Sequence, residues 1–78
     1  MIRDEYLEAQ RQDLIDELNS TARSLSHIAK PIEKKPMLYS ESNRDSLIRL
    51  AIKLHDLRTK LGQITKEISQ REKLRDLL

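Results

Sequence analysis

The residue types that most often carry chemistry are sparse in this chain and do not form a recognisable site. His27 and His55 are the only histidines, and neither has a second metal ligand at helical spacing in its own segment. Asp13 and Glu17 stand four residues apart, but a general acid needs a pocket that raises its pKa, which exposed helices do not supply. The serines lack a glycine-rich turn or a positioned base. We therefore expect no enzymatic activity, no metal and no cofactor.

Composition describes a single small domain with little material for a core. The 78 residues are 36% charged and 3% aromatic, without Phe or Trp. There is no cysteine, which excludes disulfides and thiolate sites and suits a reducing compartment. No apolar run approaches the roughly 20 residues that a membrane span requires, and Met1-Ile2-Arg3-Asp4 does not begin a signal peptide. We expect a soluble, cytoplasmic protein without membrane contact.

The second half of the chain, from Ser42 onwards, carries the strongest structural pattern. Its apolar residues alternate in spacings of three and four, which keeps them on one face of a helix. In heptad terms they fill the a and d positions and form a seam suited to another helix. These residues are Leu47, Leu50, Leu54, Leu57, Leu61, Ile64 and Ile68.

The first half predicts a second helix with the same kind of seam. Arg11 and Thr21 interrupt it, and we interpret both as structural, setting register or reaching an edge. Ile15, Ala22 and Ala29 widen the apolar face enough for a bundle core. The seam residues are Leu7, Arg11, Leu14, Leu18, Thr21, Leu25 and Ile28.

Local signals place the helix ends. Pro31 predicts that the first helix ends at residue 29 or 30, because proline lacks an amide donor and disfavours helical geometry in the residue before it. Ser42 with Asp45 resembles a capping box at the start of the second helix. The predicted elements are therefore a helix over 3–29, a connection over 30–41 and a helix over 42–77.

The single glycine and the unequal helix lengths bear on the second helix. Gly62 lies off the seam, and the seam continues in phase beyond it, which favours an unbroken helix over a break at Leu61-Gly62. At 1.5 Å per residue the second helix spans about 54 Å and the first about 40 Å. We therefore expect the last turns of the second helix to overhang the first.

Charge is distributed unevenly between the two segments. Residues 1–29 hold three basic and six acidic side chains, whereas residues 40–78 hold nine basic and six acidic ones. Opposite charges beside a helical seam favour pairing and set its orientation. The predicted fold is an all-α antiparallel helical hairpin, and because so small a core is close to break-even, we expect a coiled-coil-like dimeric bundle or a larger helical oligomer.

The predicted function is that of a small regulatory, adaptor or assembly protein that acts through helix-mediated protein contacts. Its partners are a second copy of the chain and another protein. The connection carries apolar residues that either cap the open end of the helical pair or anchor a partner, and the chain's last turns carry leucines off the seam. The candidate partner-binding residues are Met37, Leu38, Tyr39, Leu74, Leu77 and Leu78.

The alternative function is a nucleic-acid-binding helical hairpin, similar in architecture to small plasmid copy-control proteins. Basic residues of the second helix, together with lysines in the connection, would attract phosphate if they converged. They are interleaved with Asp45 and Asp56 and have no aromatic stacking partner, which favours a solvated face. The candidate nucleic-acid contacts are Arg44, Arg49, Lys53, Arg58 and Lys60.

Residues 36–71 resemble the oligomerising helical region of phage small terminase subunits. The resemblance rests on Pro36-Met37-Leu38, then Arg44, Leu50, Leu54 and Leu57, then Leu61-Gly62, with Thr65 and Arg71 beyond. In that family a helical hairpin assembles a ring that presents viral DNA to the large subunit. This chain departs from the family because Gln63-Ile64-Thr65-Lys66 contains no proline and residues 1–29 predict a single helix. The resemblance implies a phage or mobile-element origin and assigns no functional residue.

Overall fold

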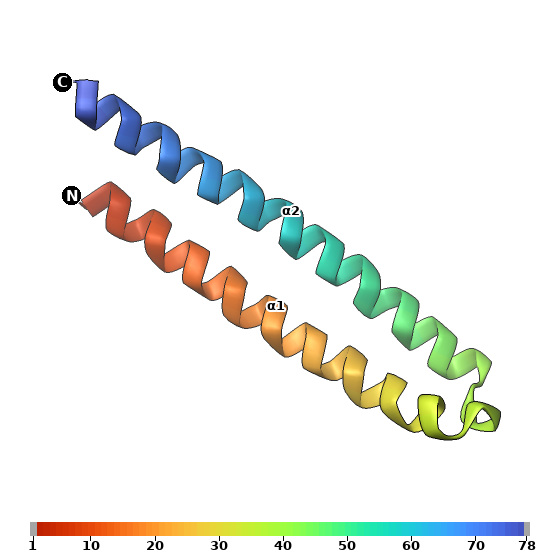
Figure 1. Ribbon diagram of the computed structural model, residues 1–78. Helices are drawn as coiled ribbons and strands as arrows, with labels where there is room; N and C mark the ends of the chain where they lie inside the picture. Colours follow the sequence, from red (N-terminus) through yellow and green to blue (C-terminus); the bar gives the residue numbers. More distant parts are fainter. Residues whose placement is uncertain (1, 78) are drawn as a thin grey trace.

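The computed structural model describes the backbone of residues 2–77 and the side chains of residues 5–77, and it contains two long helices joined by a tight turn (Figure 1). Helix α1 spans Ile2–Lys34, the 3₁₀ turn η1 spans Pro36–Leu38 and helix α2 spans Glu41–Leu77. The helices run antiparallel along a rod of 61 × 16 × 14 Å, with both chain ends at one end of the rod. The predicted all-α antiparallel hairpin is confirmed.

The two seams meet between the helices. Leu7 of α1 and Leu57 of α2 are each 5% exposed, and Thr21 is 4% exposed. The other apolar seam residues on both helices are half-buried, and none of the described side chains is fully enclosed. A pair of helices can cover only the contact line between them, so the predicted seam is correct but most of its side chains keep part of their surface in solvent.

The two polar residues on the α1 seam behave differently. The Thr21 hydroxyl donates a hydrogen bond to the backbone carbonyl of Glu17, at 2.8 Å, one turn earlier in the same helix. Thr21 can therefore be buried without a polar partner on α2. The Arg11 side chain stays 44% exposed and its guanidinium lies 3.9 Å from the Glu8 carboxylate, so it extends to the edge of the seam.

We predicted that helix α1 would end at residue 29 or 30, before Pro31. The helix instead continues through Pro31 to Lys34. Proline inside a helix costs about 3 kcal/mol relative to alanine, partly through one lost hydrogen bond. The continuation keeps Ile32, four residues after Ile28, on the seam, where it is half-buried. The Lys35 amide also donates to the Pro31 carbonyl at 2.9 Å. Burial at the next seam position outweighs the local proline signal.

The connection is correspondingly short, residues 35–40 instead of 30–41, and Ser40 rather than Ser42 caps α2. The Ser40 hydroxyl accepts a hydrogen bond from the Asn43 amide at 3.3 Å, three residues into the helix, as an N-cap does. The Asn43 side-chain amide donates to the Leu38 carbonyl at 3.0 Å and ties the helix start to the turn. These two bonds fix the start of α2 at Glu41, one residue earlier than predicted.

Helix α2 runs unbroken through Gly62, as the continuous seam predicted. With α1 extended to 33 residues and α2 at 37, the lengths are closer than expected. Gln10 and Leu14 line one groove with Lys60 and Ile64, and counting outward from there brings Ile2 level with about residue 72. The overhang is thus confined to the last turn or so of α2. No helix among the described residues is both long and apolar enough to cross a bilayer.

Candidate interaction surfaces

The hairpin has two long edges, one on each side of the seam, and their chemistry differs. On the first, Glu17 precedes the seam residue Leu18 and Lys53 precedes the seam residue Leu54, and their charged groups lie 3.5 Å apart. A groove of about 360 Å³ continues this edge toward the chain ends. We call this side the charged edge; the groove is lined by Gln10, Asp13, Leu14, Lys60, Gln63 and Ile64.

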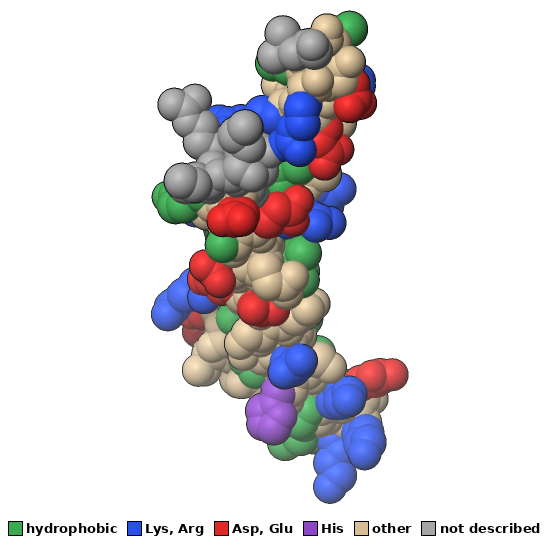
Figure 2. Space-filling model, turned by 90° about the vertical axis from the view of Figure 1, so that its left-hand side faces the viewer, with side chains coloured by type: hydrophobic (Ala, Val, Ile, Leu, Met, Phe, Trp, Pro, Cys, Tyr) green, Lys and Arg blue, Asp and Glu red, His purple; other side chains and the backbone are tan. Residues whose placement is uncertain are grey.

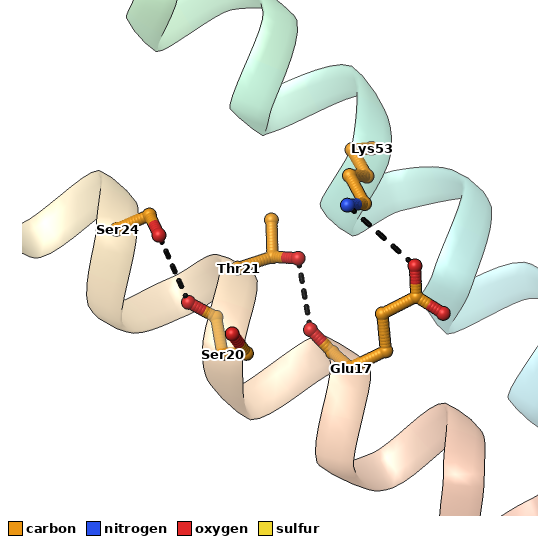
Figure 3. A network of polar contacts seen from close by, with 5 residues as sticks. All are labelled: Glu17, Ser20, Thr21, Ser24 and Lys53. Carbon is orange, nitrogen blue, oxygen red and sulfur yellow. Dashed lines mark hydrogen bonds and ion pairs between the residues drawn. The ribbon is translucent and has the colours of Figure 1, made fainter.

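Figure 3 shows how the charged edge joins the helices. The Glu17 carboxylate reaches across to Lys53 of α2, while its backbone carbonyl accepts the Thr21 hydroxyl within α1. Ser24 makes the same kind of bond to the Ser20 carbonyl at 3.2 Å. Glu17 and Lys53 are each about half exposed, so the pair contributes about 0.2–1 kcal/mol and serves alignment more than stability.

The second edge, which lies opposite, carries the residues that follow seam positions. Glu8 follows the seam residue Leu7, and Ser69 follows the seam residue Ile68. Glu8 and Ser69 line one groove, so the residues that follow seam positions on the two helices lie on the same side of the hairpin. From Ile15 to Ala29 on α1 and from Ile48 to His55 on α2 this side carries no Asp, Glu, Lys or Arg, and Arg44 and Arg58 of α2 flank that stretch. We call this part the uncharged edge and define it by Ile15, Ala22 and Ala29 of α1 with Ile48 and Ala51 of α2, to which we add Ile52, the neighbour of both on the outer face of α2.

Most apolar side chains on the uncharged edge are more exposed to solvent than the apolar side chains of the seam. Ile48 is 51% exposed and Ile52 57%, and Ala22 and Ala51 are exposed. Asn19, Ser26 and His55 lie beside them and are neutral in formal charge. From the sequence we identified the α1 residues of this edge, which widen the apolar face of the first helix, but not the α2 residues. The available signal was Ile48 and Ile52, four residues apart and both off the seam.

The turn presents the first predicted partner-binding cluster. Met37 is 97% exposed, Leu38 52% and Tyr39 51%, so these residues do not cap the open end of the helical pair. Backbone bonds from Leu38 to Lys35, at 2.9 Å, and from Tyr39 to Pro36, at 3.1 Å, hold them in a defined turn. Lys30, Lys34 and Lys35 precede this cluster in the sequence, and Figure 2 shows blue side chains gathered at the lower end, where the chain turns.

The second predicted cluster lies at the other end of the rod. Leu74 is 60% exposed and Leu77 82%, and both are at or beyond the start of α1. Leu78 lies outside the described residues. The two apolar clusters are therefore separated by the length of the hairpin (Figure 1).

The five predicted nucleic-acid contacts are distributed over two sides of α2. At 100° per residue, Arg49, Lys53 and Lys60 fall within about 40° of one another on the charged-edge side. Arg44 and Arg58 fall on the other side of the seam, and Arg44 lies 3.6 Å from Asp45. Lys53 is paired with Glu17. The helix thus brings three of the five together, beside the acidic residues of α1.

Side chains suited to catalysis or metal binding do not cluster in the described part of the chain. No group of three or more His, Asp or Glu residues there could hold a metal ion. Glu67 and Arg71, four residues apart on α2, form an ion pair at 3.2 Å. The described residues present two edges and two apolar ends as surfaces open to another molecule.

Comparison of the sequence with protein-family models, with curated proteins and with solved structures found no match.

Proposed function

We propose that this chain is a small non-enzymatic assembly or adaptor protein that binds a second copy of itself and another protein through its helices. The observation that carries the proposal is the surface area of the hairpin. It exposes 6599 Å² for a mass of 9.2 kDa, whereas a compact monomer of that mass exposes about 4,900 Å². The excess is about 1,700 Å², or roughly twice what one partner contributes to a standard interface.

Incomplete burial of the seam supports the same proposal. Only a few described side chains are well buried, and most seam leucines and isoleucines keep a minor part of their surface in solvent. Fully burying a Leu or Ile side chain yields about 1.5–3 kcal/mol, so part of the apolar contribution available to this sequence is unused in the single hairpin. Association of two hairpins would bury more of these side chains and supply the remaining apolar contribution.

For the second protein partner we propose the two apolar ends. The turn cluster Met37, Leu38 and Tyr39 and the leucines Leu74 and Leu77 offer apolar contact area at opposite ends of one rod, an arrangement suited to bridging two molecules. Ring assembly, as in phage small terminase subunits, would be one such arrangement and stays a prediction from the resemblance.

Nucleic-acid binding remains the second candidate, and one observation favours it: Arg49, Lys53 and Lys60 share a side of α2. Against it, Lys53 is engaged by Glu17, and the acidic residues of α1 lower the local positive potential. We therefore rank protein contact first.

The experiment that separates the two candidates is capture from a nuclease-treated lysate of the source cells with the tagged full-length chain. We expect a protein partner that survives nuclease and is lost in a Leu74→Ser/Leu77→Ser or Met37→Ser/Leu38→Ser variant. An Arg49→Gln/Lys60→Gln variant is the matched control and should retain the partner. Loss of all binding on nuclease treatment, or in the control variant alone, would favour the nucleic-acid reading.

A further inference from the structure

We infer that the second copy docks on the uncharged edge, so that two hairpins form a four-helix bundle with their charged edges outward. This inference rests on the self-association proposed above and specifies the face that mediates it. Two hairpins that share one apolar face form the ordinary architecture of a helical bundle, with helices packed 8–10 Å apart.

The charges of the two edges decide which one is covered. On the charged edge, Asp13 and Lys60 line the groove and Glu17 pairs with Lys53 at the surface. Covering this edge with a second hairpin would remove these groups from water, which is costly unless every one of them finds a partner. The uncharged edge carries no Asp, Glu, Lys or Arg at its six defining positions. Arg44 and Arg58 flank it on α2, and their long side chains can extend to solvent at the rim, so covering this edge imposes a smaller penalty.

The exposed apolar area points to the same edge. Ile48 and Ile52 project on α2 with more than half of their surface in solvent, next to the exposed Ala51. Ala22 and Ala29 on α1 have side chains short enough to let a second helix approach closely. In a two-fold interface each surface serves both copies, so the isoleucines of one hairpin can pack over the alanines of the other.

The hairpin as a whole has surface to spare for a dimer. A standard interface buries about 800 Å² per partner, and the hairpin exposes about 1,700 Å² more than a compact monomer of its mass would. A second copy is favoured over an unrelated helix because the same edge supplies both halves of a self-complementary surface, large side chains on α2 and small ones on α1.

The test places one negative charge on each edge in turn. Ala22→Glu and Ala51→Glu alter exposed positions of the uncharged edge, and glutamate is a good helix former, so the hairpin itself should be preserved. Ser20→Glu adds the same charge on the charged-edge side of α1 and is the matched control. By sedimentation equilibrium we expect Ala22→Glu and Ala51→Glu to weaken self-association by about 100-fold or more, and Ser20→Glu by less than about threefold.

A second measurement does not depend on breaking the dimer. The chain has no cysteine, so a single cysteine at position 22, 51 or 20 reports local access. We expect thiol labelling of Ala22→Cys and Ala51→Cys to slow at least about tenfold as protein concentration is raised through the dissociation constant, because the interface excludes the reagent. Labelling of Ser20→Cys should not change.

The outcomes separate this inference from the proposal on which it rests. A wild-type chain that is monomeric at every concentration overturns both. A wild-type dimer that withstands both glutamates, or labels equally fast at positions 22 and 20, overturns the docking face alone and leaves self-association standing. Equal loss of association in the Ser20→Glu control would also overturn it, because the effect would then follow net charge and not position.

Discussion

Glu17 of α1 and Lys53 of α2 form an ion pair across the hairpin, with carboxylate oxygen and ammonium nitrogen 3.5 Å apart. Both residues stand immediately before a seam leucine, so the pair marks the side on which the charged edges of an acidic helix and a basic helix meet. The same relationship leaves the residues that follow the seam together on the other side. This ion pair thus marks one edge of the hairpin as charged, and we propose that the opposite edge mediates association.

We expect reversal of either charge to lower stability modestly and reversal of both to restore it. Glu17→Lys or Lys53→Glu should each cost up to about 1 kcal/mol, because the pair is half exposed. The double variant should recover most of that loss, and the coupling should shrink in high salt. Urea unfolding of the wild-type, the two single variants and the double variant measures this coupling free energy. Strictly additive losses would show that the ion pair contributes nothing.

At Thr21 we expect opposite signs for two small substitutions. Thr21→Val removes a hydroxyl that donates its hydrogen bond to a carbonyl of its own helix, so stability should stay level or rise by up to about 1 kcal/mol. Thr21→Ser keeps the hydroxyl but deletes a buried methyl group and should cost about 1 kcal/mol. A loss of more than about 1 kcal/mol in the valine variant would mean that the hydroxyl has a role across the seam.

Replacing the single glycine should stabilise α2. A Cβ at position 62 would lie 3.2 Å from an Arg58 guanidinium nitrogen, and the end of that flexible side chain can move aside. Gly62→Ala should therefore raise the unfolding free energy by about 0.5–1 kcal/mol, while the control Ala9→Gly, at an exposed helical position, should lower it by a similar amount. Destabilisation by Gly62→Ala would reveal a close neighbour that the hairpin alone does not contain.

The heptad phase can be tested at two positions three residues apart. Leu57 is 5% exposed, so Leu57→Ala should cost about 2–5 kcal/mol through lost burial and a cavity. Lys60 is exposed on the charged edge, and Lys60→Ala should change stability by less than about 0.5 kcal/mol. Thermal unfolding followed by circular dichroism distinguishes the two variants. Similar losses of stability at both positions would show that the helical face assigned to the core is incorrect.

The seam was predictable because it is a long periodic pattern, and Leu7, Leu57 and Thr21 are buried where the alternation of three and four placed them. The helix ends were less predictable because they depend on competition between local and tertiary effects. Pro31 is a strong local stop signal, but burial of Ile32 on the seam overrides it. Ser40 and Ser42 are both acceptable caps in sequence, and only the bonds of Asn43 to Ser40 and Leu38 select between them.

Errors at the turn limited what could be said about the surfaces. The register between two helices depends on the conformation of their connection as well as on its length. A connection predicted over 30–41 without a defined turn therefore did not specify that Glu17 lies opposite Lys53. The exposed turn cluster was easier to anticipate, since Met37, Leu38 and Tyr39 stand outside both seams.

Sedimentation equilibrium of the wild-type chain, from about 1 to 100 µM, tests the central claim most directly. Self-association predicts a mass of at least twice 9.2 kDa at the upper concentrations and a transition temperature that rises with protein concentration. A species of 9.2 kDa throughout, with cooperative unfolding independent of concentration, would contradict it.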